Sequence, residues 1–212
     1  MKDFPFFTTR SGVAGITLKE IPYSGNAYIT IHESNEPQKL LQECLDFCLA
    51  LDAKAVYASG HACLEKYPLH TSVISMGCLR AQLGDTEAVL VPLEEKTTGE
   101  FCQIYNQGMK AVPNASHMTQ REAEKLIEKG TGYFVCSADQ LLGIGIAGEN
   151  RIDAVVAVVA GRGKDVLLAL NKALTGQRAE VEVASANTRA VRLYEELGFT
   201  KQAEFSKWYK IF

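Results

Sequence analysis

The sequence predicts an α+β protein in which a mixed, mostly antiparallel β-sheet is flanked by helices. Short apolar segments of strand length recur along the 212 residues and are separated by turn residues. Segments whose apolar residues have helical spacing lie between them, and several begin or end at residues that cap helices. The apolar fraction of 47% and the charged fraction of 22% are those of a soluble globular protein. The chain is therefore long enough for one domain or two smaller ones.

The first part of the chain has the pattern of a hairpin, a helix and two further strands. Residues 12–19 and 27–31 are rich in apolar residues and flank a turn that contains Gly25. Pro37 opens a helix, because proline prefers the first helical position. The apolar stripe of this helix consists of Leu40, Leu41, Cys44, Leu45 and Cys48. The elements expected next are a strand at 55–58, a short helix at 62–67 and a strand at 70–78.

The second part begins near Glu87 and contains longer helices. A helix over 98–110 is expected to break at the sequence around Pro113. Thr119 and Glu122 form a capping box, in which each side chain satisfies a free amide at the start of the next helix, and Gly130 ends that helix. The remaining elements expected are strands at 88–92, 133–136, 141–147, 154–159 and 205–211, and a helix at 164–174.

The segment from Val181 to Phe199 organises the C-terminal third. Val181 and Val183 alternate with a glutamate, as in a strand with one buried face. Asn187 lies where a helix N-cap is expected, because its side-chain oxygen can accept from a free amide of the first turn. Apolar residues at helical spacing follow, and Gly198 can take the left-handed conformation that ends the helix. The segment predicts a strand, a capped helix and a glycine stop.

This segment resembles the C-terminal motif of the GNAT family of acyl-CoA-dependent N-acetyltransferases. The family pattern is Asn-x-x-Ala-x-x-Leu-Tyr-x-x-x-Gly-Phe, and it is matched at Asn187, Ala190, Leu193, Tyr194, Gly198 and Phe199. An ordinary amphipathic helix with a glycine C-cap has the same periodicity, but it would not select asparagine and tyrosine at those two positions. The resemblance covers about residues 87–212 and implies a GNAT-like acyl-CoA N-acyltransferase fold, with acetyl-CoA as the co-substrate.

A loop with two glycines precedes the helix expected at 164–174. Gly161 and Gly163 would let a ligand approach backbone amides, and a helix N-terminus offers free N–H groups to a pyrophosphate. Two glycines before a helix more commonly make a tight turn without a ligand. The loop nevertheless lies where the GNAT family keeps its CoA pyrophosphate loop, one strand and one helix before the Asn187 motif. The family places Gln or Arg three residues before the first glycine, where this chain has Val158, and Asp165 is an unfavourable neighbour for phosphates.

Carried onto this sequence, the resemblance implies a site for acetyl-CoA. The strand at 154–159 would offer backbone groups to the pantetheine arm, at Val156, Val158 and Val159. The pyrophosphate would be held by the amides of Gly161, Arg162, Gly163, Lys164 and Asp165. Asn187 would hydrogen-bond the pantetheine, and Tyr194 would protonate the departing thiolate. The plain structural alternative for Tyr194 is an interface tyrosine with its hydroxyl in water.

The reaction implied is direct attack of a neutral amine on the acetyl carbonyl, so the amine must lose a proton. Glu149, Asp153, Glu182 and His117 are candidate bases by their positions, although each is also explained as a solvated side chain. The substrate face would be built by the loop at 112–117 and by the N-terminal half. Nothing in these residues identifies the amine, which could belong to a small molecule or a peptide.

The order of elements repeats along the chain. Hairpin, helix, strand, short helix and strand describe residues 12–78 and also residues 141–211. Any α/β chain shows some alternation of this kind, but the hairpin and helix lengths agree in the two copies. Because the first copy lacks the Asn–Tyr motif, we predict a degenerate, truncated half-GNAT domain at 1–86 and a GNAT N-acetyltransferase domain at 87–212.

Composition restricts the partners and the location. The net charge of −3 argues against a general nucleic-acid binder, and no apolar run is long enough to span a bilayer. The N-terminus lacks a signal-peptide core, so a cytoplasmic protein is expected. The six cysteines form no Cys-x-x-Cys pair and no metal-ligand cluster, which favours small buried thiols over a metal site or disulfides. The pairing of a half fold with a whole fold favours a monomer.

Two functions therefore stay open. The first is an acetyl-CoA-dependent N-acetyltransferase that acts on a small-molecule or peptide amine. The second is a catalytically inactive acyl-CoA-binding or interaction module of the same fold. The atypical loop at 161–165 favours the second function, and the complete Asn–Tyr motif favours the first.

Overall fold

The structure, a computed structural model, describes residues 6–212. The chain divides into two compact units. The first comprises residues up to Val73 together with Glu204–Phe212, and the second comprises Ile74–Ala203. Strands β5 (Leu69–Leu79) and β11 (Thr200–Lys210) contribute residues to both units. The predicted fold class is confirmed, because each unit has a mixed β-sheet with flanking helices.

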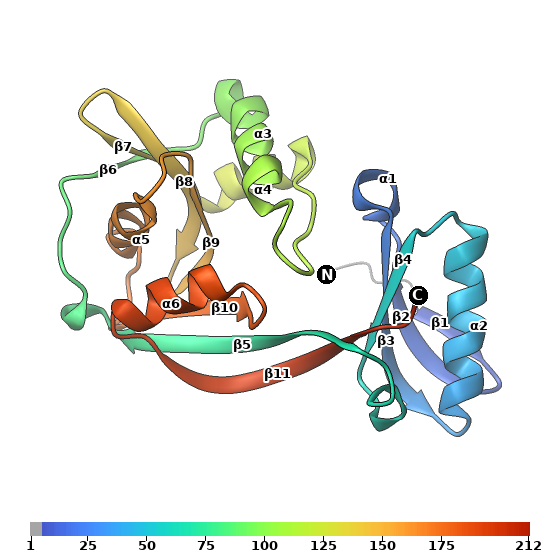
Figure 1. The fold of residues 1–212 in the computed structure, drawn as a ribbon. Coiled ribbons are helices and arrows are strands. Elements are labelled where there is room, and N and C mark those ends of the chain that lie inside the picture. The colour runs from blue at the N-terminus through green and yellow to red at the C-terminus, as the bar shows by residue number, and fades with distance from the viewer. Residues whose placement is uncertain (1–5) are drawn as a thin grey trace. The chain divides into compact units, whose positions relative to one another are not determined.

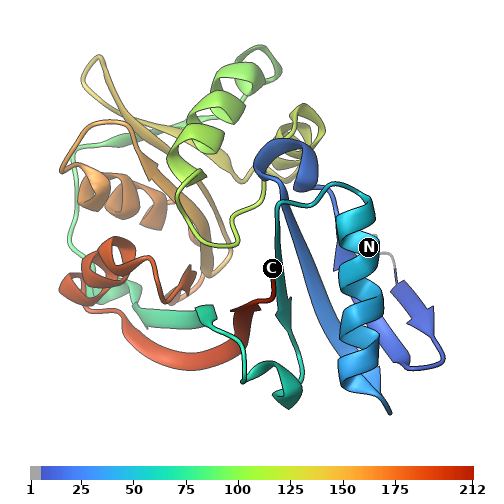
Figure 2. The ribbon, with the colours of Figure 1, turned by 45° about the vertical axis from the view of Figure 1, so that its right-hand side comes forward.

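The first unit is a mixed sheet with one long helix. Its elements are β1 (Phe6–Thr9), β2 (Gly12–Thr17), α1 (Ile21–Ser24), β3 (Asn26–Ser34), α2 (Pro37–Ala50), β4 (Ala55–Ser59) and η1 (Ala62–Leu64). Strands β1, β2 and β3 are antiparallel, and β4 lies parallel to β3 on the far side. The end of β11 then pairs antiparallel with β4, with Tyr209 opposite Ala58. Helix α2 lies along these strands (Figure 2).

The predicted stripe of α2 forms the core of the first unit. Leu40, Leu41, Cys44 and Cys48 are buried, and Pro37 is the first helical residue, as expected. Two elements were not predicted: β1, and the one-turn helix α1 in place of a simple turn. Helix α1 forms because Pro22 suits a helix start, and it ends where Gly25 adopts a left-handed φ of 75° and its amide donates to the carbonyl of Ile21.

The second unit is a three-layer structure. Its strands are the first residues of β11, the C-terminal part of β5, and then β10 (Arg178–Ala184), β9 (Arg151–Ala157), β8 (Gln140–Gly148), β7 (Gly132–Ser137) and β6 (Val89–Pro92), in that spatial order. Its helices are η2 (Arg80–Gln82), η3 (Glu95–Thr97), α3 (Thr98–Met109), α4 (Gln120–Lys129), α5 (Gly163–Asn171) and α6 (Thr188–Glu196). Helices α3 and α4 cover one face of the sheet, and α5 and α6 cover the other (Figure 1).

Local sequence explains how these layers pack. The Thr119–Glu122 capping box is confirmed: the Thr119 amide donates to Glu122 Oε2 at 2.9 Å, and the Glu122 amide donates to Thr119 Oγ1 at 3.3 Å. Gly145 in β8 has no side chain because α5 lies directly above it. A Cβ atom there would come within 2.2 Å of Leu170 Cδ1. Glycine at this position therefore allows α5 to approach the sheet closely.

Several predicted boundaries were wrong by a few residues. Strand β9 ends at Ala157 and not at Val159, because the amides of Val158 and Val159 both donate to Leu142 O and the chain bends there. Helix α5 ends at Asn171, since the amides of the next two residues donate to carbonyls three residues earlier and the last turn tightens. Strand β11 begins at Thr200, five residues before the predicted start, because it continues directly from the α6 glycine stop.

The predicted half copy is not clearly visible in residues 6–86. Strands β3 and β4 are parallel and joined by a helix, but they pair over five positions without separating. The corresponding strands β9 and β10 pair over only two positions and then separate. The division of the chain at residue 86 stays a prediction.

Candidate functional site

Strands β9 and β10 are parallel neighbours that pair only over two register positions. Glu180 lies opposite Arg151, and Val181 lies opposite Ile152. Among the described residues, the rest of β9 has no register partner on β10. Its amides and carbonyls on that side are therefore available to an extended ligand, which could bind as an added strand does at a sheet edge.

A β-bulge in β9 marks the point where the two strands separate. Ile146 of β8 lies opposite Ala154, while the next β8 residue lies opposite Ile152, so Asp153 is an extra residue in β9. The bulge exchanges the two faces of the strand. Ile152 packs in the cluster under α5 and α6, whereas Ala154 and Val156 pack under α3 and α4. A bulge also bends the strand that carries it, which accounts for the short pairing with β10.

Arg151 joins the two strands just before they separate. Its Nε lies 2.6 Å from Asp153 Oδ1, and its guanidinium NH1 group donates to Glu182 Oε1 of β10 at 3.0 Å. The ion pairs are about half exposed, so their contribution to stability is small. They engage two of the four candidate bases, Asp153 and Glu182. Of the other two, Glu149 lies in the β8–β9 turn with a left-handed φ of 52°.

The loop between β9 and α5 has the form expected for a ligand cradle. Gly161 has a left-handed φ of 80°, and a Cβ atom built on it would meet nothing within 4 Å. Gly163 begins α5, and a Cβ atom there would lie 3.3 Å from Leu193 Cδ2 of α6. The first-turn amides of α5, at Gly163, Lys164 and Asp165, have no intrahelical partner. A helix start of this kind suits an anion.

Arg162 and Asp165 form an ion pair at this helix start. Arg162 Nε lies 2.9 Å from Asp165 Oδ2, and the two residues are three apart on the helix. The Nε atom is sealed from solvent but is not aligned for a hydrogen bond with any residue of 6–212. Thr86 Oγ1 donates to Asp165 Oδ1 at 3.2 Å. Asp165 therefore points toward Arg162 and Thr86.

Helix α6 begins and ends as predicted. The Asn187 side chain accepts from the Ala190 amide at 3.3 Å, so its N-cap role is confirmed. The side-chain oxygen Oδ1 of Asn187 is engaged in this bond, which leaves the Nδ2 group as the donor that a ligand could use. Gly198 has a φ of 88°, and Phe199 is buried behind it.

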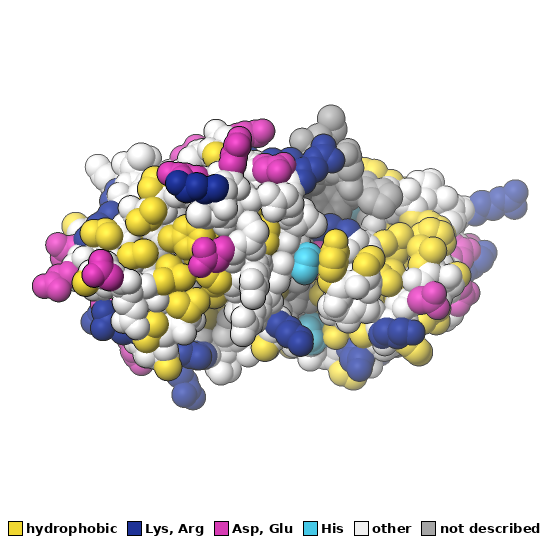
Figure 3. Space-filling view, turned by 90° about the horizontal axis from the view of Figure 1, so that it is seen from above, with side chains coloured by type: hydrophobic (Ala, Val, Ile, Leu, Met, Phe, Trp, Pro, Cys, Tyr) yellow, Lys and Arg dark blue, Asp and Glu magenta, His cyan; other side chains and the backbone are white. Residues whose placement is uncertain are grey.

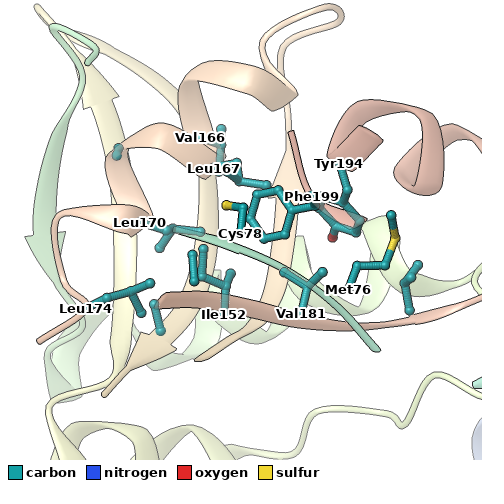
Figure 4. Close-up of a cluster of buried hydrophobic side chains, with 14 of the residues drawn as sticks. Met76, Cys78, Ile152, Val166, Leu167, Leu170, Leu174, Val181, Tyr194 and Phe199 are labelled. Carbon is teal, nitrogen blue, oxygen red and sulfur yellow. The ribbon is translucent and has the colours of Figure 1, made fainter. Parts of the chain in front are cut away.

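Tyr194 lies in the apolar cluster beneath α6. Figure 4 shows its ring beside that of Phe199, with the hydroxyl oxygen directed from the helix toward the strands that carry Met76 and Val181. The residue is 8% exposed. Burial raises the pKa of Tyr194 to about 12, so the hydroxyl keeps its proton at neutral pH. Whether it faces a bound thioester stays a prediction.

The other predicted cofactor residues are placed as follows. The Val158 side chain is 45% exposed, and Val159 packs partly buried against the α5–α6 cluster. The Val156 side chain points to the α3–α4 face, so a contribution from this residue to the pantetheine arm would come from its backbone. Lys164 is exposed at the start of α5.

The loop between α3 and α4 is fixed by hydrogen bonds of Asn106. Its Oδ1 accepts from the Met118 amide at 2.7 Å, and its Nδ2 donates to the Met118 carbonyl at 3.0 Å. Asn106 Nδ2 also lies 3.3 Å from His117 Nε2. His117, the fourth candidate base, is therefore held on a well-anchored loop.

Residues 6–212 contain no cluster of three or more His, Cys, Asp or Glu side chains that could hold a metal ion. No helix in this part of the chain combines the length and apolar character that crossing a bilayer requires. On the face seen in Figure 3, basic and acidic side chains are interspersed.

The bulge at Asp153 and the Arg151 ion pairs were not expected from the sequence. A bulge leaves little trace in a single sequence, since one extra residue only shifts the alternation of apolar positions. Burial along Ile152, Asp153 and Ala154 alternates as in a regular strand, so the bulge appears only in the register with β8.

The residues present fit acetyl-CoA in most respects. The free edge of β9, the open glycine loop and the first-turn amides of α5 match an extended arm and its phosphates. The carboxylate of Asp165 would oppose the phosphates, and the basic residues Arg162 and Lys164 would partly offset it.

A scan against protein-family models finds no match for this sequence, and a search of curated proteins finds none. Solved structures do match. A functionally unknown conserved protein from Staphylococcus epidermidis is 12% identical over 99% of this chain and 94% of its own, with a TM-score of 0.60. A putative acetyltransferase from Pyrococcus horikoshii is 13% identical over 95% and 69%, with a TM-score of 0.60. A GCN5-related N-acetyltransferase from Anabaena variabilis is 13% identical over 94% and 59%, with a TM-score of 0.59.

These identities are too low to transfer an activity or a substrate. The structural similarity itself establishes that the chain has the GNAT-like acetyltransferase fold.

Proposed function

We propose that the chain is an acetyl-CoA-dependent N-acetyltransferase that acts on an amine of a small molecule or a peptide. The observation that supports this most directly is the separation of the parallel strands β9 and β10 beyond Ile152. Strands that separate in this way expose backbone groups to a ligand that lies between them. The glycine loop and the starts of α5 and α6 follow directly from these two strands.

We assign the acetyl-CoA contacts as follows. The backbone of Val156 in β9, and of Val158 and Val159 just after it, binds the pantetheine arm. Because the amides of Val158 and Val159 donate to Leu142 O, these two residues would contribute carbonyl oxygens. The amides of Gly161, Gly163, Lys164 and Asp165 bind the pyrophosphate. The Arg162 amide donates to the Val159 carbonyl at 3.2 Å, so Arg162 would contribute its guanidinium. The Nδ2 group of Asn187 donates to the pantetheine, since its oxygen caps α6.

Bound acetyl-CoA would supply an acetyl group activated as a thioester. Tyr194 keeps its proton at neutral pH, because its pKa is raised to about 12 by burial. It would donate a hydrogen bond to the leaving sulfur. A phenol this weakly acidic stabilises a thiolate better by hydrogen bonding than by giving up its proton, since an ordinary thiol has a pKa near 8.5. This refines the expectation that Tyr194 protonates the thiolate outright.

Four side chains are candidates for the base that deprotonates the amine: Glu149, Asp153, Glu182 and His117. Asp153 and Glu182 are each in an ion pair with Arg151, so their carboxylate oxygens are already engaged by a guanidinium. Glu149 and His117 keep their places as candidates, His117 on the loop at 112–117 that we assign to the acceptor.

The second candidate function is an inactive acyl-CoA-binding or interaction module. Two observations favour it: Asp165 in the first turn of α5, and the Tyr194 hydroxyl directed into an apolar cluster. Both functions require the same ligand site, so they differ in chemistry and not in binding.

Calorimetric titration with acetyl-CoA tests the site. Heat of binding together with a rise in melting temperature would support both functions, whereas neither signal at millimolar ligand would remove both. If acetyl-CoA binds, an assay of thiol release over a broad panel of amines separates the two. Release no faster than in buffer would favour the inactive module.

The organisation of the whole chain is part of the proposal. We assign the acetyltransferase domain to residues 87–212, and we keep residues 1–86 as a degenerate half copy of it, on the order of elements alone. We also propose a cytoplasmic monomer. Sedimentation analysis at several concentrations would show a mass near 23.2 kDa for a monomer and about twice that for a dimer.

A further inference from the structure

We propose that Asp165 lowers the affinity of the chain for phosphate-bearing acyl donors by holding Arg162 in an ion pair. Phosphate binding would then require Arg162 to exchange one anionic partner for another. This inference rests on the proposed acetyl-CoA site, and it concerns how tightly the phosphate end of the ligand is bound.

The ion pair lies at the place where the phosphates would bind. Arg162 is the N-cap residue of α5, and Asp165 is in the first turn. Their side chains meet at 2.9 Å, between Nε and Oδ2. The Asp165 carboxylate thus already interacts with the partial positive charge of the helix start and with the guanidinium of Arg162 beside it. Both are features that an incoming phosphate would otherwise use.

Asp165 is the fixed member of the pair. Its second carboxylate oxygen accepts from Thr86 Oγ1 at 3.2 Å. Thr86 is itself held, because its carbonyl accepts from Lys172 Nζ at 2.5 Å and its amide donates to Asp85 Oδ1 at 2.7 Å. The carboxylate is therefore anchored to the segment before β6, which is tied to both ends of α5.

Arg162 is the member that can move. Its side chain is 44% exposed, and apart from the ion pair no hydrogen bond of its Nε atom is found among residues 6–212. A guanidinium can bind carboxylate or phosphate oxygens in the same planar geometry. An exchange of Asp165 for phosphate is therefore possible without a change in the backbone.

The surroundings add negative charge. An open hollow of about 520 Å³ adjoins the pair, and its ionisable lining residues are Asp85, Glu87, Asp165 and Arg162. Lys172 lies 3.2 Å from Asp85 and offsets that carboxylate. Glu87 adds a negative charge beside the helix start, and the charge of Asp165 is offset only while Arg162 stays paired with it. A pyrophosphate would meet electrostatic repulsion there that it would not meet at an uncharged first turn.

Two ligands and two substitutions test this by calorimetry. Coenzyme A carries the phosphates, and pantetheine is the same thiol arm without them. Asp165→Asn removes the charge but keeps an oxygen that can accept from Thr86. We expect it to bind coenzyme A about five- to tenfold more tightly than the wild type, as removal of one nearby charge implies, with pantetheine affinity unchanged.

The role of Arg162 is tested in both backgrounds. In the wild type, Arg162→Gln should change coenzyme A affinity by less than about twofold, because the guanidinium is already paired. In the Asp165→Asn background, Arg162→Gln should remove most of the gain in coenzyme A affinity that Asp165→Asn produces. If Arg162→Gln changes coenzyme A affinity by the same factor in both backgrounds, Arg162 does not exchange Asp165 for phosphate, and the proposal is overturned.

Controls separate the possible failures. Asp85→Asn removes a carboxylate of the same hollow that does not belong to α5, so it should have little effect. If Asp85→Asn raises coenzyme A affinity as much as Asp165→Asn does, the effect comes from the net charge of the hollow and not from the ion pair, and the proposal is overturned.

Melting temperatures check folding, and Asp165→Ser is a second variant if the asparagine variant unfolds. If coenzyme A binds wild type and Asp165→Asn equally, this inference fails and the proposed function stands. If it binds none of the variants, both fail.

Discussion

The rings of Tyr194 and Phe199 lie 5.7 Å apart, inclined by 45°, so the last residue of the α6 motif packs directly on its tyrosine. The Gly198 turn makes this possible: with a φ of 88° it reverses the chain, and the Phe199 amide then donates to the Tyr194 carbonyl at 3.0 Å. Phe199 is 2% exposed. The motif therefore has a structural purpose that is independent of any ligand.

Truncation of Phe199 should be strongly destabilising. Phe199→Ala leaves a cavity under α6, and we expect a loss of about 3–5 kcal/mol in the free energy of unfolding. Phe199→Leu, which keeps most of the volume, should lose about 1.5 kcal/mol or less. Urea denaturation measures both. A loss below about 1 kcal/mol for Phe199→Ala would show that the end of α6 is not packed as the structure has it.

Removal of the Tyr194 hydroxyl should affect chemistry and not folding. None of the hydrogen bonds identified among residues 6–212 involves this hydroxyl, so Tyr194→Phe should keep the stability of the wild type within about 1 kcal/mol. If Tyr194 acts on the leaving sulfur, kcat should fall by about 100-fold or more, while coenzyme A affinity stays within about threefold. Phe199→Leu is the matched control for a change in packing at the same place. An unchanged kcat would leave Tyr194 as a core residue.

The pH dependence of stability provides a second test of Tyr194. Its pKa is raised from 10.0 to about 12 in the folded state by burial, so the folded state favours the protonated form. The stability that this shift contributes is fully present below pH 10 and is lost as the pH rises toward about 12. The loss amounts to about 2–3 kcal/mol at the upper end.

Comparison with Tyr194→Phe isolates this contribution from those of other groups. The difference in free energy of unfolding between wild type and variant should change steadily between pH 9 and pH 11.5, to the disadvantage of the wild type. A difference that stays constant over this range would mean that the hydroxyl is better solvated than the structure indicates.

The parts of this fold that the sequence predicts are those that depend on local rules. The capping box at Thr119, the Asn187 cap and the glycine stop after α6 each rest on residues within one or two turns of one another. Their physical causes are contained in the segment itself. The register of these elements was therefore correct even where the ends of α5 and β9 were not.

The features that define the candidate site depend on distant residues. Whether β9 and β10 stay paired depends on the bulge at Asp153 and on Arg151, which reaches Glu182 some thirty residues further along the chain. The direction of the Asp165 carboxylate depends on Thr86, which precedes it by 79 residues. No periodicity or spacing within either segment contains this information, so the sequence could suggest the site but not its geometry.

Thiol reactivity should follow the burial of the six free cysteines. Cys44, Cys48 and Cys78 are buried, and burial raises the pKa of Cys44 to about 12 and that of Cys48 to about 11. Because the thiolate is the reactive form, these thiols should be inert in the native protein. Cys63, Cys102 and Cys136 are half-buried and should react first.

Labelling with iodoacetamide at pH 8, followed by peptide mass analysis, distinguishes the two groups. In denaturant all six thiols should react at similar rates, which is the internal control. Rapid native labelling of Cys44 or Cys48 would contradict the packing of α2 on the first unit.

Asn114 offers a test of the loop between α3 and α4. Residues Val112–Ala115 form a turn in which the Ala115 amide donates to the Val112 carbonyl at 3.2 Å, and Asn114 has a left-handed φ of 60°. Proline followed by asparagine suits the two central positions of such a turn. Both polar atoms of the Asn114 side chain are nevertheless sealed from solvent, without a hydrogen-bond partner among residues 6–212.

Substitution of Asn114 by glycine and by alanine separates the cost of the unsatisfied side-chain amide from the cost of the left-handed backbone. Asn114→Gly removes the unsatisfied amide, worth about 1–3 kcal/mol, and fits the left-handed backbone at an entropic cost of about 0.5–1 kcal/mol. It should therefore be more stable than the wild type. Asn114→Ala also removes the amide but carries a cost of about 1–2 kcal/mol for its left-handed backbone, so it should differ little from the wild type. Denaturation of the three proteins side by side measures the order. If Asn114→Gly is the least stable of the three, the amide has a partner such as an ordered water molecule, and the loop is held by that contact and not by Asn106 alone.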